Sequence, residues 1–335
     1  MEKGLDREVM LLADKHSDGW NFAREIQNYL KKEKDFDMPL NEVQINKFRS
    51  GEIDMHVPEN LRQRNVYFVQ DSNKNPQDWW IELMLMGDLL NNSSTNNSNF
   101  VLPNLLYGRK DRKDKPRVPI SSRVLANSII PYMDRLLTVD MHAEQIQGSY
   151  PAKIPIDSLQ SFPYVVDYLR DNYYKGLENL VVVSPDAGGA DRAKTFLEKL
   201  KNANKKDSES HNYSFAIMDK NRYEAGKVGE MDLIGDVNNK NVLVVDDIID
   251  SGGTQSKAAD VLKENGANKV FCYGTHGIFT KGTEDLYNKF DAVITSNTHY
   301  QNNTNVDVVD LSPLFGEAIY RNHTGESISE LFRNE

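Results

Sequence analysis

An apolar run that ends in two adjacent acids and a glycine-rich turn limits which folds this sequence can adopt. The run Asn241-Val-Leu-Val-Val leads into Asp246 and Asp247, and the turn Asp250-Ser-Gly-Gly-Thr254 precedes a stretch of helical period. A buried strand that passes through a polar turn into a helix is a unit of α/β folds, which bind ligands at the carboxyl ends of their strands. The segment therefore predicts an α/β fold with a ligand site at this turn.

Segments typical of strands alternate with segments typical of helices along the rest of the chain. Short runs rich in β-branched residues predict buried strands, and stretches of 3.6-residue period predict helices between them. The predicted strands are Val66–Gln70, Leu137–Asp140, Leu180–Ser184, Val242–Val245 and Val270–Tyr273, and the clearest predicted helices are Asp167–Asn172 and Ser256–Asn265, the latter ended by Gly266. This order predicts mostly parallel sheets flanked by helices.

The length of 335 residues is roughly twice that of a common domain, so two domains are expected. We place them at residues 1–158 and 159–335, with the boundary in the proline-containing stretch Pro151–Pro163. Two similar sheets are compatible with a diverged duplication. The polar stretches Asn91–Asn99 and Lys201–Asn212 are predicted to be solvated surface insertions.

Composition excludes several classes of function. A formal net charge of -10 argues against a long nucleic-acid footprint, which needs many exposed cations. Cys272 is the only cysteine, so no internal disulfide or cysteine metal site is expected, and a reducing compartment fits. Met1–Met10 lacks the apolar core of a signal peptide, and no apolar run is long enough to span a membrane. We expect a cytoplasmic protein without nucleic-acid or membrane partners.

The turn after the acid pair is suited to a phosphate monoester. The backbone N–H groups of residues 250–254 and the hydroxyls of Ser251 and Thr254 are expected to meet a helix N-terminus, which favours anions. Gly252 and Gly253 allow close backbone approach. Asp246 and Asp247 are suited to accept hydrogen bonds from vicinal ribose hydroxyls, directly or through a metal. The alternative is an ordinary helix cap that follows two solvated acids.

Three further segments carry candidate functional groups. Val181-Val-Val-Ser-Pro-Asp-Ala-Gly-Gly ends a strand at Asp186, which could hold a divalent cation, and His142 follows another strand. The segment Tyr107–Ser121 is rich in Lys and Arg and is a natural partner for a triphosphate. Each has an ordinary alternative: an Asp-containing turn, a hydrogen-bonded structural histidine, and a solvated loop.

The strand, acid pair and turn resemble the loop of type I phosphoribosyltransferases that binds phosphoribosyl pyrophosphate (PRPP). Taken together, the segments resemble the ribose-phosphate diphosphokinase (PRPP synthetase) family from Phe48 to Phe332. The most specific are Tyr-x-Arg with Asp-Arg-Lys, Asp-x-His-Ala with Gln-Ile-Gln-Gly, Val-Ser-Pro-Asp-Ala-Gly-Gly, and Thr275-His-Gly-Ile-Phe279. The resemblance implies two similar phosphoribosyltransferase-like domains, with ATP and ribose 5-phosphate as substrates and Mg²⁺ as cofactor.

The resemblance also implies roles for individual residues. It implies Lys220 and Arg222 as the catalytic pair, and His142 and Asp186 as metal ligands. The implied ATP-binding residues are Phe48, Ser50, Glu52, Arg109, Lys110, Asp111 and His142, and those implied for ribose 5-phosphate are Asp246, Asp247, Asp250, Ser251, Gly252, Gly253 and Thr254. The chain departs from the family at Lys110, where the family has Gln, and at Ser50, where it has Asn.

The resemblance further implies a homo-oligomer built from dimers, with a hexamer as one form, because the Phe-x-x-Gly-Glu segment reaches a neighbouring subunit's ATP site. A regulatory site for phosphate and ADP is suggested by Arg62, Lys113, Arg117, Gln147, Ser327, Ile328 and Ser329, with subunit packing as an equally open alternative. Two other functions stay open. They are a non-catalytic regulatory subunit of the same family and a nucleobase phosphoribosyltransferase.

Overall fold

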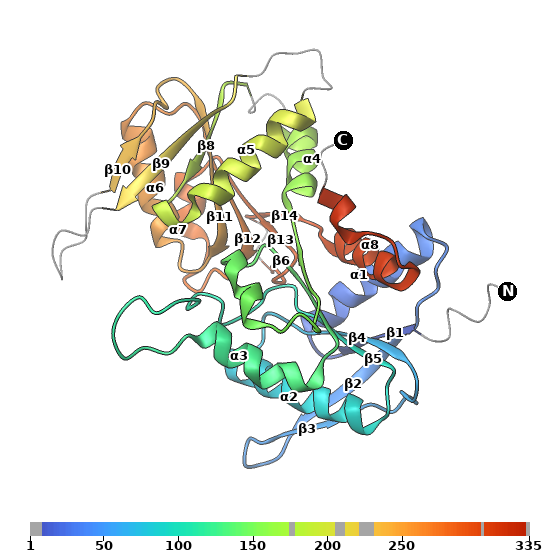
Figure 1. Cartoon of the computed structure of the whole chain (residues 1–335). Coiled ribbons are helices and arrows are strands. Elements are labelled where there is room, and N and C mark those ends of the chain that lie inside the picture. Colours follow the sequence, from blue (N-terminus) through green and yellow to red (C-terminus); the bar gives the residue numbers. More distant parts are fainter. Residues whose placement is uncertain (1–8, 174–177, 205–211, 221–230, 303–304, 333–335) are drawn as a thin grey trace. The chain divides into compact units, whose positions relative to one another are not determined.

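The protein is described by a computed structural model that covers residues 9–173, 178–204, 212–220, 231–302 and 305–332 (Figure 1). The chain divides into two compact units. The first contains residues 1–160, 298–300 and 311–331, and the second contains residues 161–297, 301–310 and 332–335. None of the described helices is long and apolar enough to cross a membrane.

The first unit is built on a seven-stranded sheet of order β3-β2-β1-β4-β5-β6-β7. β2 and β3 form an antiparallel hairpin, and the other neighbours are parallel. The strands are β1 Val9–Asp14, β2 Leu40–Lys47, β3 Ile53–His56, β4 Asn65–Val69, β5 Asn97–Val101, β6 Arg135–Val139 and β7 Ile156–Leu159, and the helices are α1 Asp18–Glu33, α2 Pro76–Asn92, α3 Ser121–Ile129 and α8 Ser312–Thr324. Short 3-10 turns are η1 Ile130–Tyr132 and η2 Glu144–Ser149.

The second unit repeats this plan with a sheet of order β10-β9-β8-β11-β12-β13-β14. Only β9 and β10 are antiparallel neighbours. The strands are β8 Leu180–Ser184, β9 Ser214–Lys220, β10 Met231–Ile234, β11 Asn241–Ile249, β12 Val270–Gly277, β13 Ala292–Ser296 and β14 Asp307–Val309, and the helices are α4 Phe162–Tyr173, α5 Ala190–Asn204, α6 Gly253–Glu264 and α7 Glu284–Lys289. The prediction of two similar, mostly parallel sheets flanked by helices is confirmed.

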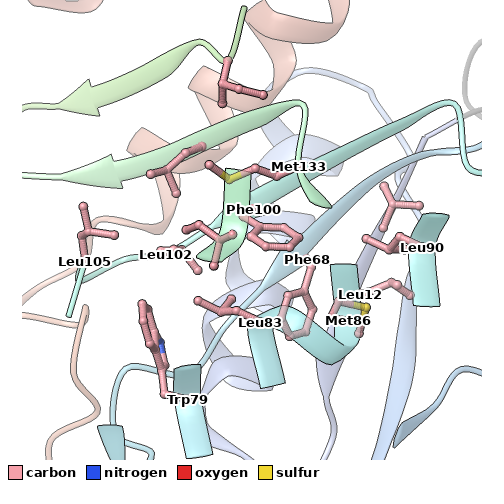
Figure 2. Close-up of a cluster of buried hydrophobic side chains, with 14 of the residues drawn as sticks. Leu12, Phe68, Trp79, Leu83, Met86, Leu90, Phe100, Leu102, Leu105 and Met133 are labelled. Carbon is pink, nitrogen blue, oxygen red and sulfur yellow. The ribbon is translucent and has the colours of Figure 1, made fainter. Parts of the chain in front are cut away.

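The core of the first unit lies between the sheet and helices α2 and α3. Figure 2 shows Trp79, Leu83 and Met86 of α2 pointing toward Phe68 and Phe100 of the neighbouring strands. These side chains are fully buried, and the rings of Phe68 and Phe100 meet edge to face with centroids 6.2 Å apart. Burial of large apolar side chains is the main force that stabilises such a layer.

Helix α8 packs on α1 within the same unit, although almost 280 residues of sequence lie between them. The rings of Phe22 and Phe315 meet edge to face at 5.3 Å. Beside them, the buried Glu317 carboxylate accepts hydrogen bonds from the Tyr29 hydroxyl at 2.8 Å, the Lys34 ammonium at 2.6 Å and the Arg321 guanidinium at 2.8 Å. Apolar contacts and one satisfied buried charge therefore hold the C-terminal helix in place.

Two expectations about local structure are wrong. Asn91–Asn99 is not one solvated insertion, because α2 runs to Asn92 and β5 begins at Asn97, with Ser98 and Asn99 buried. Lys201–Asn204 belongs to α5, and residues 205–211 lie outside the described part of the chain. The hydrophobic pattern did not reveal these helix and strand ends because they carry polar side chains. The hydrogen-bond partners of such side chains, such as the Val66 carbonyl for Asn99, lie far away in sequence.

Candidate active site

The acid pair lies where one strand of the second sheet continues past its neighbour. β11 pairs with β8 only as far as Val244, opposite Val183, but continues alongside β12 to Ile249. Asp246 and Asp247 therefore lie within β11, beyond the end of β8, rather than after the strand as expected. This is the carboxyl edge of parallel strands, where α/β sheets bind their ligands.

The carboxyl groups of the pair are strongly coupled. Asp247 is almost fully buried, and Asp246 is partly exposed. Burial and, after it, the adjacent Asp247 carboxylate raise the pKa of Asp246 to about 8, although the Arg192 guanidinium opposes the shift. The pair thus holds a proton close to neutral pH.

Arg192 of α5 is a partner that sequence reasoning missed. Its Nη1 lies 2.9 Å from Asp247 Oδ1 and 3.4 Å from Asp246 Oδ1. The buried Gln255 amide of α6 donates to Asp246 Oδ2 at 2.9 Å. Arg192 lies three residues after the quoted Asp-Ala-Gly-Gly segment, and its position in the first turn of a helix at the strand edge was an available signal.

The turn after the pair is tightly held. The Thr280 hydroxyl donates to Asp250 Oδ1 at 2.7 Å, and the Thr280 N–H donates to the Asp250 carbonyl at 2.9 Å. Gly252 has a φ of 73°, and an added Cβ would lie 2.9 Å from Leu286. Glycine is required there by both backbone conformation and packing. Because α6 begins at Gly253, earlier than predicted, Gly253 and Thr254 belong to the first helical turn, and Ser251 is exposed beside it.

Asp186 belongs to the same edge. It follows the end of β8, and its Oδ1 accepts the Gly189 N–H at 3.1 Å. The Ser184 hydroxyl donates to the Asp186 carbonyl at 2.7 Å. The Asp186 carboxylate is near enough to Asp246 to raise the pKa of that group, so three acids share this edge.

In the first unit, the structure brings the basic segment and His142 together. Gly108, at the start of the segment, would place an added Cβ 3.6 Å from the His142 Cβ. The Gln145 amide donates to Asp111, and the Lys110 ammonium donates to Asp114 at 2.6 Å. The segment is thus held by side-chain hydrogen bonds at Lys110 and Asp111, directly after Arg109.

Three contacts fix the ends of this basic segment. The rings of Trp80 and Tyr107 meet at 4.6 Å, and the Ser121 hydroxyl donates to the Tyr107 carbonyl at 3.0 Å. At the other end, the Ser122 hydroxyl donates to the Lys110 carbonyl at 3.2 Å. The segment leaves and rejoins the unit at nearly one place, so it forms a closed loop.

The remaining candidate ATP-binding residues lie at the tip of the β2–β3 hairpin. The Phe48 N–H donates to the Glu52 carbonyl at 2.9 Å, and the Ser50 hydroxyl donates to the Glu52 carboxylate at 2.7 Å. The Phe48 side chain is 59% exposed. An exposed aromatic ring on a tight turn is available to a ligand or to another subunit.

The candidate regulatory residues are all partly or fully exposed in the first unit. Gln147 donates to Glu144 at 2.5 Å, and the Ser327 and Ser329 hydroxyls are 3.0 Å apart. Arg62, Lys113 and Arg117 are exposed, and Ile328 is half-buried. A regulatory role for this set stays a prediction.

The candidate catalytic pair is only partly described. Lys220 is the last residue of β9, and Arg222 lies outside the described residues. Within the described ranges, no group of three or more His, Cys, Asp or Glu side chains is arranged to hold a metal. His142 lies in the first unit and Asp186 in the second.

Comparison with known proteins covers both units. Residues 13–131 match the family model described as the N-terminal domain of ribose phosphate pyrophosphokinase. Residues 176–333 match the phosphoribosyl synthetase-associated domain. A solved structure of phosphoribosylpyrophosphate synthetase from Mycobacterium smegmatis superposes with a TM-score of 0.82 at 26% identity, over 95% of this chain and 99% of that one.

Curated relatives agree along nearly the whole chain. A ribose-phosphate pyrophosphokinase from Rhizobium meliloti is 38% identical over 92% of this chain and 96% of its own length. One from Hyphomonas neptunium is 38% identical over 88% and 93%, and ribose-phosphate pyrophosphokinase 4 of Saccharomyces cerevisiae is 37% identical over 88% of both chains. The chain belongs to the ribose-phosphate pyrophosphokinase family.

Proposed function

We propose that this chain transfers the β,γ-diphosphoryl group of ATP to the 1-hydroxyl of ribose 5-phosphate, giving PRPP and AMP for nucleotide biosynthesis. One structural observation supports the choice of acceptor most directly. Asp246 and Asp247 lie at a carboxyl strand edge, directly before a tight turn and the N-terminus of α6. That arrangement offers carboxylates to sugar hydroxyls and a helix end to the 5-phosphate.

The acid pair and the turn bind the ribose 5-phosphate. When ionised, Asp246 and Asp247 accept hydrogen bonds from the vicinal hydroxyls, and Arg192 and Gln255 hold the pair in position. The α6 N-terminus and the hydroxyls of the turn receive the phosphate. The anchored side chain of Asp250 maintains the turn through Thr280.

The first unit supplies the nucleotide-binding half. Arg109, Lys110 and Asp111 of the closed basic loop bind ATP, and His142 lies beside the loop. Phe48, Ser50 and Glu52 on the exposed hairpin tip contribute to a nucleotide site in a second copy of the chain. We therefore propose a cytoplasmic homo-oligomer built from dimers.

The described residues fit a weakly ligated Mg²⁺ ion. Mg²⁺ in phosphate sites is held by one or two carboxylates together with water and substrate oxygens, so a cluster of three protein ligands is not required. Asp186 and His142 are the residues that would hold it, and the bound ion would neutralise charge on the diphosphate.

The reaction requires positioning and charge neutralisation more than a strong base. The ribose 1-hydroxyl attacks the β-phosphorus, AMP leaves, and cationic side chains stabilise charge on the transferring oxygens. We assign this role to Lys220 and Arg222. Lys220 ends β9, the strand next to β8, and Asp186 follows the end of β8.

An assay with ATP, Mg²⁺ and ribose 5-phosphate tests these assignments. Lys220→Ala and Arg222→Ala should each lower turnover by about two to three orders of magnitude, with a much smaller change in substrate binding, because the lost interaction forms mainly in the transition state. Lys269→Ala, which removes an exposed cation elsewhere in the second unit, is the matched control and should keep wild-type turnover. Wild-type turnover in either catalytic variant would refute its assignment.

A further inference from the structure

A polar pocket lies at the opposite end of the first sheet from the nucleotide-binding residues. Its volume is about 390 Å³. Asn65, Asn97 and Arg135 begin the parallel strands β4, β5 and β6, and all three line it. His142 follows the carboxyl end of β6, about 16 Å away along a five-residue strand. The remaining lining residues are Tyr67, Asn99, Asp134, Lys153, Pro155, Asn322 and His323.

The pocket presents hydrogen-bond donors that have no acceptor in the described part of the protein. Lys153 makes no hydrogen bond or ion pair with any described residue. The buried Tyr67 hydroxyl accepts from the Asn322 amide, and its own hydrogen is left without an acceptor among the described residues. Arg135 bonds Asp157 through Nη1 alone, so its other N–H groups remain available within the same ranges.

Two of the acceptors around the pocket are already engaged. One oxygen of the Asp134 carboxylate accepts the Ser98 N–H at 2.8 Å. Asn65 Oδ1 accepts from both Asn96 and Asn97, at 2.7 and 2.9 Å. Neither group takes up the donors of Lys153, Arg135 and Tyr67, so the pocket is suited to a ligand rich in acceptors.

Chemistry and size narrow the class of ligand. Burial raises the pKa of Tyr67 to about 12, so the hydroxyl stays protonated and can only gain from an acceptor. An ammonium, a guanidinium and a phenol that converge on one pocket match the several oxygens of a phosphate group. A volume of about 390 Å³ lies within the range of small-molecule sites and leaves room for a sugar beside the phosphate.

We propose that this pocket binds a small phosphorylated molecule, with Lys153, Arg135 and the Tyr67 hydroxyl as its phosphate ligands. None of its lining residues belongs to the sets assigned to catalysis, to substrate binding or to the candidate regulatory site. The site is therefore independent of the proposed reaction. Free phosphate, a sugar phosphate and a mononucleotide share the required chemistry, and the experiment separates them.

A reporter in the pocket avoids confusion with phosphate binding at the active site. Asn97→Cys places a thiol at the exposed rim, and the only natural cysteine, Cys272, is fully buried. The alkylation rate of the introduced thiol by iodoacetamide is measured in the full chain. The probes are inorganic phosphate, ribose 5-phosphate and AMP, with ribose and adenosine as phosphate-free controls.

We expect saturable protection by at least one of the three phosphate compounds and none by ribose or adenosine. Adding Lys153→Ala or Tyr67→Phe should raise the concentration for half-protection about tenfold or more, since each removes one hydrogen bond to a charged group. Lys269→Ala, an equal loss of charge outside the pocket, should leave protection unchanged. The proposal is overturned by a reactive thiol that none of the three phosphate compounds protects, by equal protection from ribose or adenosine, or by protection that survives Lys153→Ala.

Discussion

Arg192 is the single residue that most favours the ionised form of the acid pair Asp246 and Asp247. A buried carboxyl pair that lost this cation would bind protons more tightly, because Arg192 is the group that lowers the pKa of Asp246. The proposed contacts to ribose hydroxyls require ionised acids. The protonation of Asp246 and Asp247 is therefore expected to limit activity on the acid side.

Replacing Arg192 tests this role. Arg192→Met should raise the pKa of the pair above its present value of about 8, so the acid limb of the kcat/KM profile should move to higher pH. Arg192→Lys should restore part of the shift because it returns a positive charge. Lys194→Met removes a cation of the same helix that lies over the Phe215 ring, and should leave the limb in place. A uniform loss of rate with an unmoved limb would show a purely structural role.

The candidate site residues could be predicted from the sequence more readily than the residues that hydrogen-bond to them. The acids, the glycines and Asp186 stand in short motifs with a local chemical meaning. The bond between Arg192 and Asp246 joins residues 54 positions apart, and the Asp250 partner Thr280 is 30 positions away. Such contacts depend on how β8, β11 and β12 align, which hydrophobic pattern alone does not specify.

Among the helices and strands, the hydrophobic runs predicted the positions of the central strands well but predicted the ends of those strands poorly. Leu180–Ser184 is found as predicted, because it is a continuous buried run. β11 continues through two acids, and β5 begins in a stretch of Asn and Ser. The polar hairpin of β2 and β3 has no apolar run of its own. Tertiary hydrogen bonds decide these segments, so local composition fails there.

Helix α2 offers a test of packing against the core. A Cβ added at Gly87 would overlap the Tyr132 side chain at its Cβ, an atom that cannot swing away. Gly87→Ala should lower the free energy of unfolding by about 1–3 kcal/mol, although alanine favours helix by about 1 kcal/mol. Gly148→Ala, where nothing lies within 4 Å of the added Cβ, is the control for denaturant unfolding. Equal stability of Gly87→Ala and wild type would contradict the packing seen here.

Across the whole molecule, the two units share one strand order but carry different side chains at the carboxyl edges of their sheets. In the second unit, the β11 edge carries Asp246 and Asp247 before a tight turn. At the equivalent edge of the first unit, the Lys74 ammonium lies 2.8 Å from both Asp14 and Glu82 and closes the cluster internally. This difference supports the proposal that ribose 5-phosphate binds at the edge of the second sheet.

The C-terminal helix provides a pH-dependent test of the first unit. Burial alone would raise the pKa of Glu317, but hydrogen bonds from Lys34, Arg321 and Tyr29 outweigh it, and the pKa is lowered. A lowered carboxyl pKa contributes stability above its unfolded value of 4.5, and that stability is lost as pH falls through the folded value.

Glu317→Gln should therefore lower the free energy of unfolding near pH 7 by about 1–3 kcal/mol. The difference from wild type should shrink as the pH falls below the unfolded value of 4.5, in urea unfolding followed across the pH range. Glu326→Gln, an exposed carboxylate just after the same helix, is the control. A difference that is constant with pH would mean that the charge of Glu317 does not hold the helix.

In the proposed reaction, the diphosphoryl group moves as a unit from ATP to the sugar. Phosphorus NMR of the full chain with ATP, Mg²⁺ and ribose 5-phosphate follows this transfer, because AMP and PRPP have separate signals from ADP and free diphosphate. We expect AMP and PRPP to appear together in equal amounts, and only when ribose 5-phosphate is present. Formation of ADP in place of AMP, or no AMP at all under varied phosphate and metal, would contradict the proposed reaction.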